Sequence, residues 1–261
     1  ADTKGTQRTA EFLRVVCDAT ARLAAEWMAA GFIHGVLNTD NLNVTGESFD
    51  YGPWRFLPTY KPGFTAAYFD ETGLYCYARQ PEAVFWALQQ LAVALLPVGE
   101  RDALVDVLNT FPDTYATQMT RAFCRRLGVV KQEDSEAMVK ALLAFLEASQ
   151  LPFEAVFFDH FCGDMARAAG SPRDYAGEGY EAFGILLRGH APDRPERLSH
   201  AYFQRRDPVH MTIETMESAW APIHESDDWS DLHALWKDIA QARAGYDLGA
   251  GRIGFLPGEA A

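Results

Sequence analysis

The chain has 261 residues, of which 48% are apolar and 23% are charged, so it can bury a full core as one large domain or two small ones. Its formal net charge of -13 comes from acidic residues spread along the chain, and such a field repels nucleic acid and anionic membranes. No apolar run reaches the roughly 18 to 20 residues of a membrane-spanning helix, and the N-terminus has no signal-type apolar stretch. We therefore expect a cytoplasmic protein that binds neither nucleic acid nor membrane.

The helical periodicity begins early in the chain. Apolar residues between Thr9 and Ala30 recur at steps of three and four, which predicts one long amphipathic helix that ends at Gly31. A polar loop follows as far as Asn41. Two short β-like segments are then expected over 42–44 and 48–50, with Thr45-Gly46 as the turn between them.

Residues 51–80 are rich in proline, glycine and aromatic residues, which is typical of an ordered but irregular loop. Helical patterns then continue nearly to the end, over 81–96, 101–109, 115–127, 135–148, 174–188, 209–222 and 229–243. No internal repeat or low-complexity tract interrupts them. We expect a mainly α-helical domain over 1–261, with active-site loops at 32–54 and a helical remainder at 81–245.

The four cysteines stand far apart in the sequence, at Cys17, Cys76, Cys124 and Cys162. They form no C-x-x-C pair and no zinc-ligand spacing, so buried reduced thiols are expected, which again indicates the cytosol. The segment 159–164 carries several metal-capable side chains, but neighbours on one segment rarely all point at one ion. A helix end with a buried thiol is the preferred interpretation there.

The residues that point to chemistry lie between His34 and Gly52. They read His-Gly-Val-Leu-Asn-Thr-Asp-Asn over 34–41 and, after the two β-like segments, Asp-Tyr-Gly over 50–52. Phosphoryl and nucleotidyl transfer need a divalent ion held by hard oxygen ligands and a carboxylate that accepts the proton of the nucleophile. In the protein-kinase fold, a loop after a long helix supplies an Asn ligand and the residue before an x-Gly turn supplies an Asp. The same order predicts Asn41 and Asp50 as Mg²⁺ ligands and Asp40 as the base.

A purely structural interpretation stays open for each motif alone. Asp and Asn are common turn residues, so Asp40-Asn41 could cap a turn and Asp50 could begin a loop. The combined spacing favours the functional interpretation. His34 is expected to hold the loop as a scaffold, and Val36 stands where the usual kinase loop has its catalytic Asp, so the base must be Asp40.

These segments resemble the active-site region of the selenoprotein O (YdiU) family. The resemblance rests on the motif over 34–41, on Phe-Asp-Tyr-Gly-Pro-Trp over 49–54, and on Tyr75 and Arg79-Gln80-Pro81 before a helix that contains Trp86 and Leu91. It is strong from about residue 9 to residue 96, fair to about residue 163 and weak afterwards.

The resemblance implies a protein-kinase-like enzyme that binds ATP in an inverted orientation. Such an enzyme transfers AMP, and not phosphate, to Ser, Thr or Tyr hydroxyls of proteins. Asp40 would be the proton acceptor. Asn41 and Asp50 would hold Mg²⁺ or Mn²⁺ and contact the nucleotide.

Three departures limit what the resemblance implies. The family's N-lobe, with its glycine-rich loop and ATP-contacting Lys, would lie before Ala1. The missing initiator Met suggests a cut, and processing of a natural N-terminus would give the same start. The family's C-terminal selenocysteine or cysteine has no counterpart after Cys162, and its Asn-Pro and Arg-Asn pattern appears only as Arg206-Asp207-Pro208. We therefore expect the helical C-lobe alone, with the N-lobe absent and with weak or no activity in isolation.

Two other functions remain open at this stage: a kinase-type phosphotransferase, and a non-catalytic helical interaction module. The glycine-rich run over 249–254 fits a dinucleotide fingerprint but has too few residues after it for a βαβ unit, so we set it aside. The six tryptophans are expected to pack in the core and loops.

Overall fold

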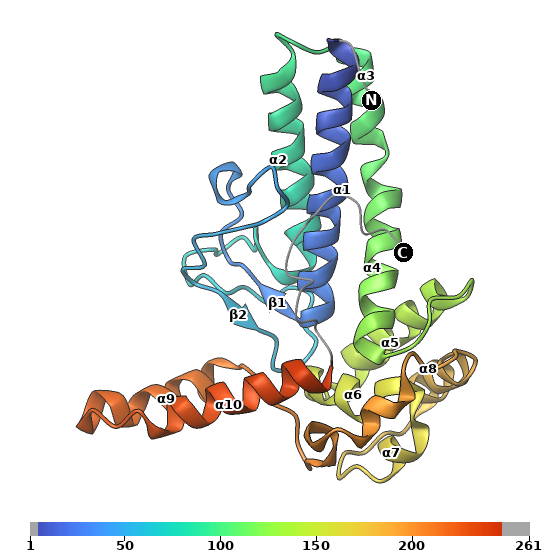
Figure 1. The fold of residues 1–261 in the computed structure, drawn as a ribbon, viewed down its shortest axis with the longest axis vertical. Coiled ribbons are helices and arrows are strands. Elements are labelled where there is room, and N and C mark those ends of the chain that lie inside the picture. Colours follow the sequence, from blue (N-terminus) through green and yellow to red (C-terminus); the bar gives the residue numbers. More distant parts are fainter. Residues whose placement is uncertain (1–4, 247–261) are drawn as a thin grey trace. The chain divides into compact units, whose positions relative to one another are not determined.

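The computed structural model describes residues 5–246; residues 1–4 and 247–261, including the glycine-rich run, lie outside the described part. Within residues 5–246 the chain is mainly helical, as the sequence predicts (Figure 1). The helices are α1 (Thr6–Ala30), α2 (Gln80–Leu95), α3 (Arg101–Asn109), α4 (Phe111–Leu127), α5 (Ser135–Ser149), α6 (Phe153–Asp159), α7 (Met165–Ala169), α8 (Glu178–Arg188), α9 (Ile213–Ser226) and α10 (Ser230–Gly245). The kinase-like arrangement of a C-lobe stays a prediction.

The described chain divides into two compact units. The first comprises residues 5–55 and 62–122, and the second comprises residues 56–61 and 123–246. Each unit has its own cluster of buried apolar side chains.

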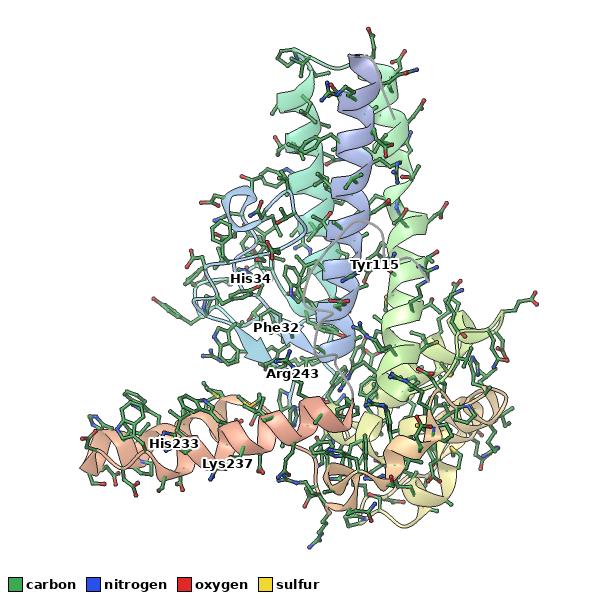
Figure 2. The ribbon with its side chains drawn as sticks, in the orientation of Figure 1. Phe32, His34, Tyr115, His233, Lys237 and Arg243 are labelled. Carbon is green, nitrogen blue, oxygen red and sulfur yellow. The ribbon has the colours of Figure 1, made fainter. Side chains whose placement is uncertain are left out.

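The first unit is built around α1. This helix packs against α2 and α3, and Figure 1 shows α1 and α2 side by side. Its apolar face, with Leu13, Val16 and Trp27, forms the core together with Val84 and Leu88 of α2. Tyr115 of α4 packs against the same cluster (Figure 2). The predicted end of α1 is confirmed, because Gly31 adopts φ 65° and its N–H caps the last turn.

The strands differ from the sequence prediction. The segments expected at 42–44 and 48–50 form only one antiparallel bridge, between Leu42 and Ser48, because the turn at Asn43–Gly46 leaves too few residues for a ladder. The two-stranded sheet pairs β1 (Phe32–Ile33) with β2 (Arg55–Phe56). These strands contain two residues each, which is below the length that a period-of-two pattern reveals.

The helical boundaries also need corrections. Helix α4 begins at Phe111 and not at residue 115, because Pro112 is tolerated in its first turn. Helices α8 and α9 each begin four residues later than predicted, at Glu178 and Ile213. The short helices α6 and α7 were missed, since neither is long enough for a clear helical periodicity.

The side chains bear out some of the burial predictions and contradict others. All four cysteines are buried free thiols, and α6 ends at Asp159 just before Cys162, as expected. The tryptophan prediction is wrong for Trp86, Trp220, Trp229 and Trp236, which are exposed. Among residues 5–246, no helix is both long enough and apolar enough to span a bilayer.

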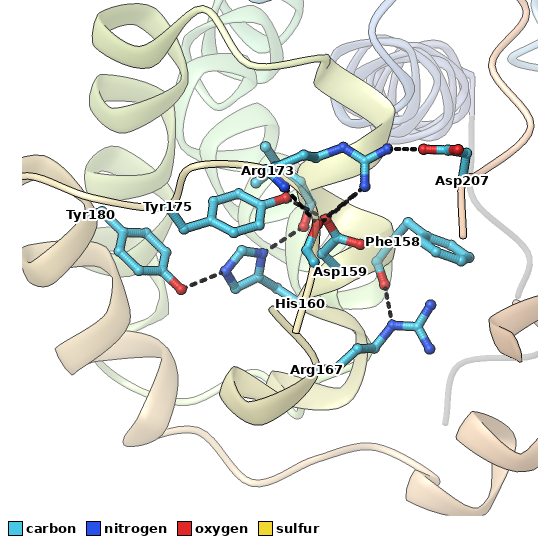
Figure 3. Close-up of polar contacts among 10 residues, drawn as sticks. Phe158, Asp159, His160, Arg167, Arg173, Tyr175, Tyr180 and Asp207 are labelled. Carbon is cyan, nitrogen blue, oxygen red and sulfur yellow. Dashed lines mark hydrogen bonds and ion pairs between the residues drawn. The ribbon is translucent and has the colours of Figure 1, made fainter. Parts of the chain in front are cut away.

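A buried polar network organises the second unit (Figure 3). The Oδ2 atom of Asp159 accepts hydrogen bonds from Ser171 Oγ at 2.7 Å, Arg173 Nη1 at 3.0 Å and the Tyr175 hydroxyl at 2.6 Å. Arg173 also donates through Nη2 to the exposed Asp207 at 2.6 Å. Burial and the bond to Asp159 raise the pKa of Tyr175, which keeps this hydroxyl a donor. The network ties the loop after α7 to the end of α6.

His160 lies next to this network and is fully buried. Its Nδ1–H donates to the Val156 carbonyl at 2.8 Å and its Nε2 accepts from the Tyr180 hydroxyl at 3.1 Å, so the ring is held in its neutral form (Figure 3). Burial lowers the pKa of His160 below its ordinary value of 6.5.

This burial predicts a loss of stability in mild acid. As the pH falls through 6.5, His160 becomes protonated in the unfolded chain but stays neutral in the folded protein. Because the unfolded state then binds more protons, unfolding becomes more favourable. The loss should reach about 1.4 kcal/mol per pH unit for this histidine. Urea unfolding at pH 7.5, 6.5 and 5.5 measures it, and His160→Gln should show a shallower slope. Equal slopes for the two proteins would contradict the expectation.

Candidate active site

Asn41 is held in place by hydrogen bonds of both its side chain and its backbone. It ends the short 3-10 turn Thr39–Asn41 and is buried. Its Nδ2 donates to the Val36 carbonyl at 3.0 Å, which orients the amide so that Oδ1 is the side-chain atom able to bind a cation. The backbone carbonyl of Asn41 accepts from Ser48 Oγ at 2.8 Å and from the Phe49 N–H at 3.4 Å. These bonds bring the segment that precedes Asp50 alongside Asn41.

Asp50 is the residue directly after Phe49, and the chain changes direction there. Its φ of 59° lies in the left-handed region, which Asp tolerates better than most residues. A bond from the Gly52 N–H to the Asp50 carbonyl, at 2.9 Å, closes the turn. The segment 41–50, closed by the bridge between Leu42 and Ser48, is a short hairpin, and the backbones of Asn41 and Asp50 are held at its same end.

Asp40, the predicted base, lies in the same 3-10 turn and is exposed. Two residues before it, Asn38 Oδ1 accepts a hydrogen bond from the Tyr75 hydroxyl at 2.7 Å. The pKa of Tyr75 is raised, first by burial and then by the carboxylates of Asp70 and Asp40. An exposed carboxylate next to Asn41 can accept a proton from an incoming hydroxyl group.

His34 takes the scaffold position expected of it. The side chain is fully buried, and its Nε2 lies 3.1 Å from the Phe49 carbonyl, one residue before Asp50. The ring packs on Tyr51 and Trp27, with centroid distances of 5.0 and 5.7 Å. Burial lowers the pKa of His34, so the neutral ring donates from Nε2 and fixes the segment that precedes Asp50.

Gln80 is a site-building residue to which the sequence assigned no role. It begins α2 and is fully buried. Its Oε1 accepts from the His34 N–H at 2.9 Å, and its Nε2 donates to the carbonyls of Phe32 at 2.9 Å and Tyr77 at 3.3 Å. One amide thus joins the start of the loop over 34–41 to α2. In the sequence, Gln80 shows only as a polar residue before Pro81 at the start of a helix, and this pattern does not predict that the side chain is buried.

A cavity of about 470 Å³ lies behind the hairpin. It is lined by residues of α1, the hairpin and α2, among them Val16, Leu42 and Trp86, and none of its lining residues is charged. A triphosphate needs cationic or metal partners, so this cavity is not a suitable phosphate site.

The donor set at the hairpin fits magnesium. Mg²⁺ commonly takes one or two carboxylates, with waters and substrate phosphates completing its shell. Asn41 and Asp50, whose backbones lie at the same end of the hairpin, would supply one amide and one carboxylate oxygen. Within residues 5–246 no group of three or more His, Cys, Asp or Glu side chains is arranged to hold a metal.

Comparison with known proteins assigns the family. The family model described as "Protein adenylyltransferase SelO" matches residues 2–240. A protein of Trichodesmium erythraeum named "Protein nucleotidyltransferase YdiU" is 35% identical over 230 residues, which cover 84% of this chain and 48% of that protein. The protein of the same name from Gloeobacter violaceus is 34% identical over 249 residues, covering 88% of this chain and 50% of its own length. The chain thus spans about half the length of these relatives, and it belongs to the SelO family.

Proposed function

We propose that this chain carries the metal-binding and proton-accepting part of a protein adenylyltransferase that moves AMP from ATP to Ser, Thr or Tyr hydroxyls of proteins. The observation that carries the proposal is the pairing of Asn41 with residues 48 and 49, which holds Asn41 and Asp50 at one end of the hairpin. The relatives' names and the matching family model support nucleotidyl transfer as the reaction class.

In the proposed reaction, the acceptor hydroxyl oxygen attacks the α-phosphorus of ATP. The bond between the α-phosphorus and the bridging oxygen to the β-phosphate breaks, and pyrophosphate leaves with that electron pair. Asp40 takes the proton of the hydroxyl. Asn41 and Asp50 would hold Mg²⁺ or Mn²⁺, which when bound neutralises phosphate charge. His34 and Gln80 keep the two ligands in place and touch neither substrate.

The metal assignment predicts a Mg²⁺-dependent gain in thermal stability with ATP. A ligand present at 100 times its dissociation constant stabilises the fold by about 2.7 kcal/mol. Asp50→Asn keeps a residue that tolerates the left-handed backbone but removes the charge, so the ATP-dependent shift in Tm should vanish. Glu71→Gln, an equally conservative change at an exposed site, should retain the shift. An unchanged shift in Asp50→Asn would exclude Asp50 as a ligand.

Labelled ATP distinguishes the reaction class. Transfer of label from α-labelled ATP to protein, with none from γ-labelled ATP, supports adenylylation. The opposite result would show a kinase-type phosphotransfer. If ATP and Mg²⁺ do not shift the Tm of the unmodified chain, the metal assignment is contradicted and the alternative of a helical interaction module is favoured.

A further inference from the structure

Asn38 directly precedes the turn Thr39–Asn41, and its side chain bonds to a distant part of the chain. Asn at such a position usually accepts a hydrogen bond from a backbone N–H two or three residues further on. Among the described residues no such bond forms, although the backbone of Asn38 has the extended conformation of a cap. Its Oδ1 atom instead accepts from the Tyr75 hydroxyl at 2.7 Å. The start of the turn is thus tied to a residue 37 positions later.

Tyr75 is held by contacts of both its ring and its backbone. The half-buried ring packs against the core of the first unit. Its N–H donates to the Asp70 carboxylate at 2.8 Å, and the same carboxylate accepts from the Leu74 N–H at 2.8 Å. Burial and the nearby carboxylates raise the pKa of Tyr75, so the hydroxyl stays protonated and remains a donor. Because the ring is already fixed, the bond to Asn38 costs little further conformational entropy.

Asp40 depends on the turn more than Asn41 does. Asn41 has bonds of its own, from its side chain to the Val36 carbonyl and from Ser48 Oγ to its backbone carbonyl. Asp40 is exposed, and among the described residues its carboxylate has no hydrogen bond or ion pair. Its position therefore follows from the backbone of the turn, which the Asn41 N–H closes by donating to the Asn38 carbonyl at 3.1 Å. A carboxylate that accepts a proton must be held within hydrogen-bond reach of the reacting hydroxyl.

We propose that Tyr75 is a positioning residue for the proton acceptor: its hydroxyl holds Asn38, and through Asn38 it holds the turn that presents Asp40. This inference rests on the proposed function, because that function gives Asp40 its role. A side chain that capped its own turn would stabilise the turn without placing it relative to the rest of the first unit. The bond to Tyr75 does place it, since the Tyr75 ring belongs to the packed core.

NMR relaxation of the unliganded chain tests the inference. Tyr75→Phe keeps the packed ring and removes only the hydroxyl. The backbone order parameter of Asp40 should then fall from about 0.85, the value of a rigid backbone, toward about 0.6. That of Asn41 should change little, because its own hydrogen bonds remain. Tyr68→Phe is the matched control, since it removes the hydroxyl of a 95% exposed ring in the same loop and should leave both order parameters unchanged.

The proposed reaction gives a second readout. AMP transfer from α-labelled ATP should be about tenfold slower in Tyr75→Phe with an unchanged KM for ATP, because a displaced proton acceptor affects only the transfer step. Asn38→Leu, which removes the acceptor of the same bond, should reproduce both effects. The double variant should show no larger effect than either single variant, because each change removes the same interaction.

The outcomes separate this inference from the proposed function. An unchanged order parameter of Asp40 in Tyr75→Phe, or an equal loss of order at Asn41, overturns the inference, and so does an unchanged transfer rate. Where transfer is too slow to follow, the order parameters decide. Loss of order at Asp40 in a chain whose Tm does not respond to Mg²⁺ and ATP supports Tyr75 and contradicts only the proposed metal site. A Mg²⁺-dependent shift in Tm with unchanged order at Asp40 contradicts only the role of Tyr75.

Discussion

Replacing Asp159 by alanine is expected to lower the free energy of unfolding by about 3–5 kcal/mol, which is the usual cost of removing one partner of a buried ion pair. The side chains of Asp159 and Arg173 are only 5% and 13% exposed, so the guanidinium would lose its partner in a poorly hydrated position. The hydroxyls of Ser171 and Tyr175 would also lose their acceptor. The expected change is therefore far larger than for a surface charge.

Asp207→Ala is the matched control, because Asp207 pairs with the same Arg173 but its side chain is 61% exposed. Its removal should change the unfolding free energy by about 1 kcal/mol or less. Urea denaturation followed by circular dichroism measures both variants. If Asp159→Ala does not fold, Asp159→Asn, which keeps an acceptor oxygen, should fold with an intermediate loss of stability. Similar small effects for Asp159→Ala and Asp207→Ala would show that the network contributes little.

Gln80→Leu is expected to lower the unfolding free energy by about 3 kcal/mol, since buried groups left without a hydrogen-bond partner cost about 1–3 kcal/mol each. The His34 N–H would lose its acceptor, and the carbonyls of Phe32 and Tyr77 would lose a donor. Because His34 in turn bonds to Phe49, the change should also weaken the Mg²⁺-dependent effect of ATP. This second effect is what a purely structural glutamine would not produce.

Gln89→Leu provides the control on the same helix, because Gln89 is exposed. It should change stability by about 0.5 kcal/mol or less. Chemical denaturation gives the stability of each variant, and thermal shift with Mg²⁺ and ATP reports on the site. A Gln80→Leu variant as stable as Gln89→Leu, with its nucleotide response intact, would refute the assigned role.

The long helix α1 and its end at Gly31 could be predicted from the sequence, because a 3.6-residue apolar period and a left-handed glycine cap are local signals. The order of the motifs over 34–52 was equally local and was sufficient to name the family. The helices α6 and α7 and the two-residue strands carry too few residues for a period, so local pattern could not reveal them.

The sequence alone determined the family, the mainly helical class and the candidate residues Asp40, Asn41 and Asp50. Only the tertiary structure decided how they are supported. The bond from Gln80 to His34 joins residues 46 positions apart, and that from Tyr75 to Asn38 joins residues 37 positions apart. The tertiary structure also decided that the Asp159 carboxylate is buried and that the Trp86 ring is exposed. Burial and long-range hydrogen bonding depend on which segments meet in space, and no local periodicity encodes that.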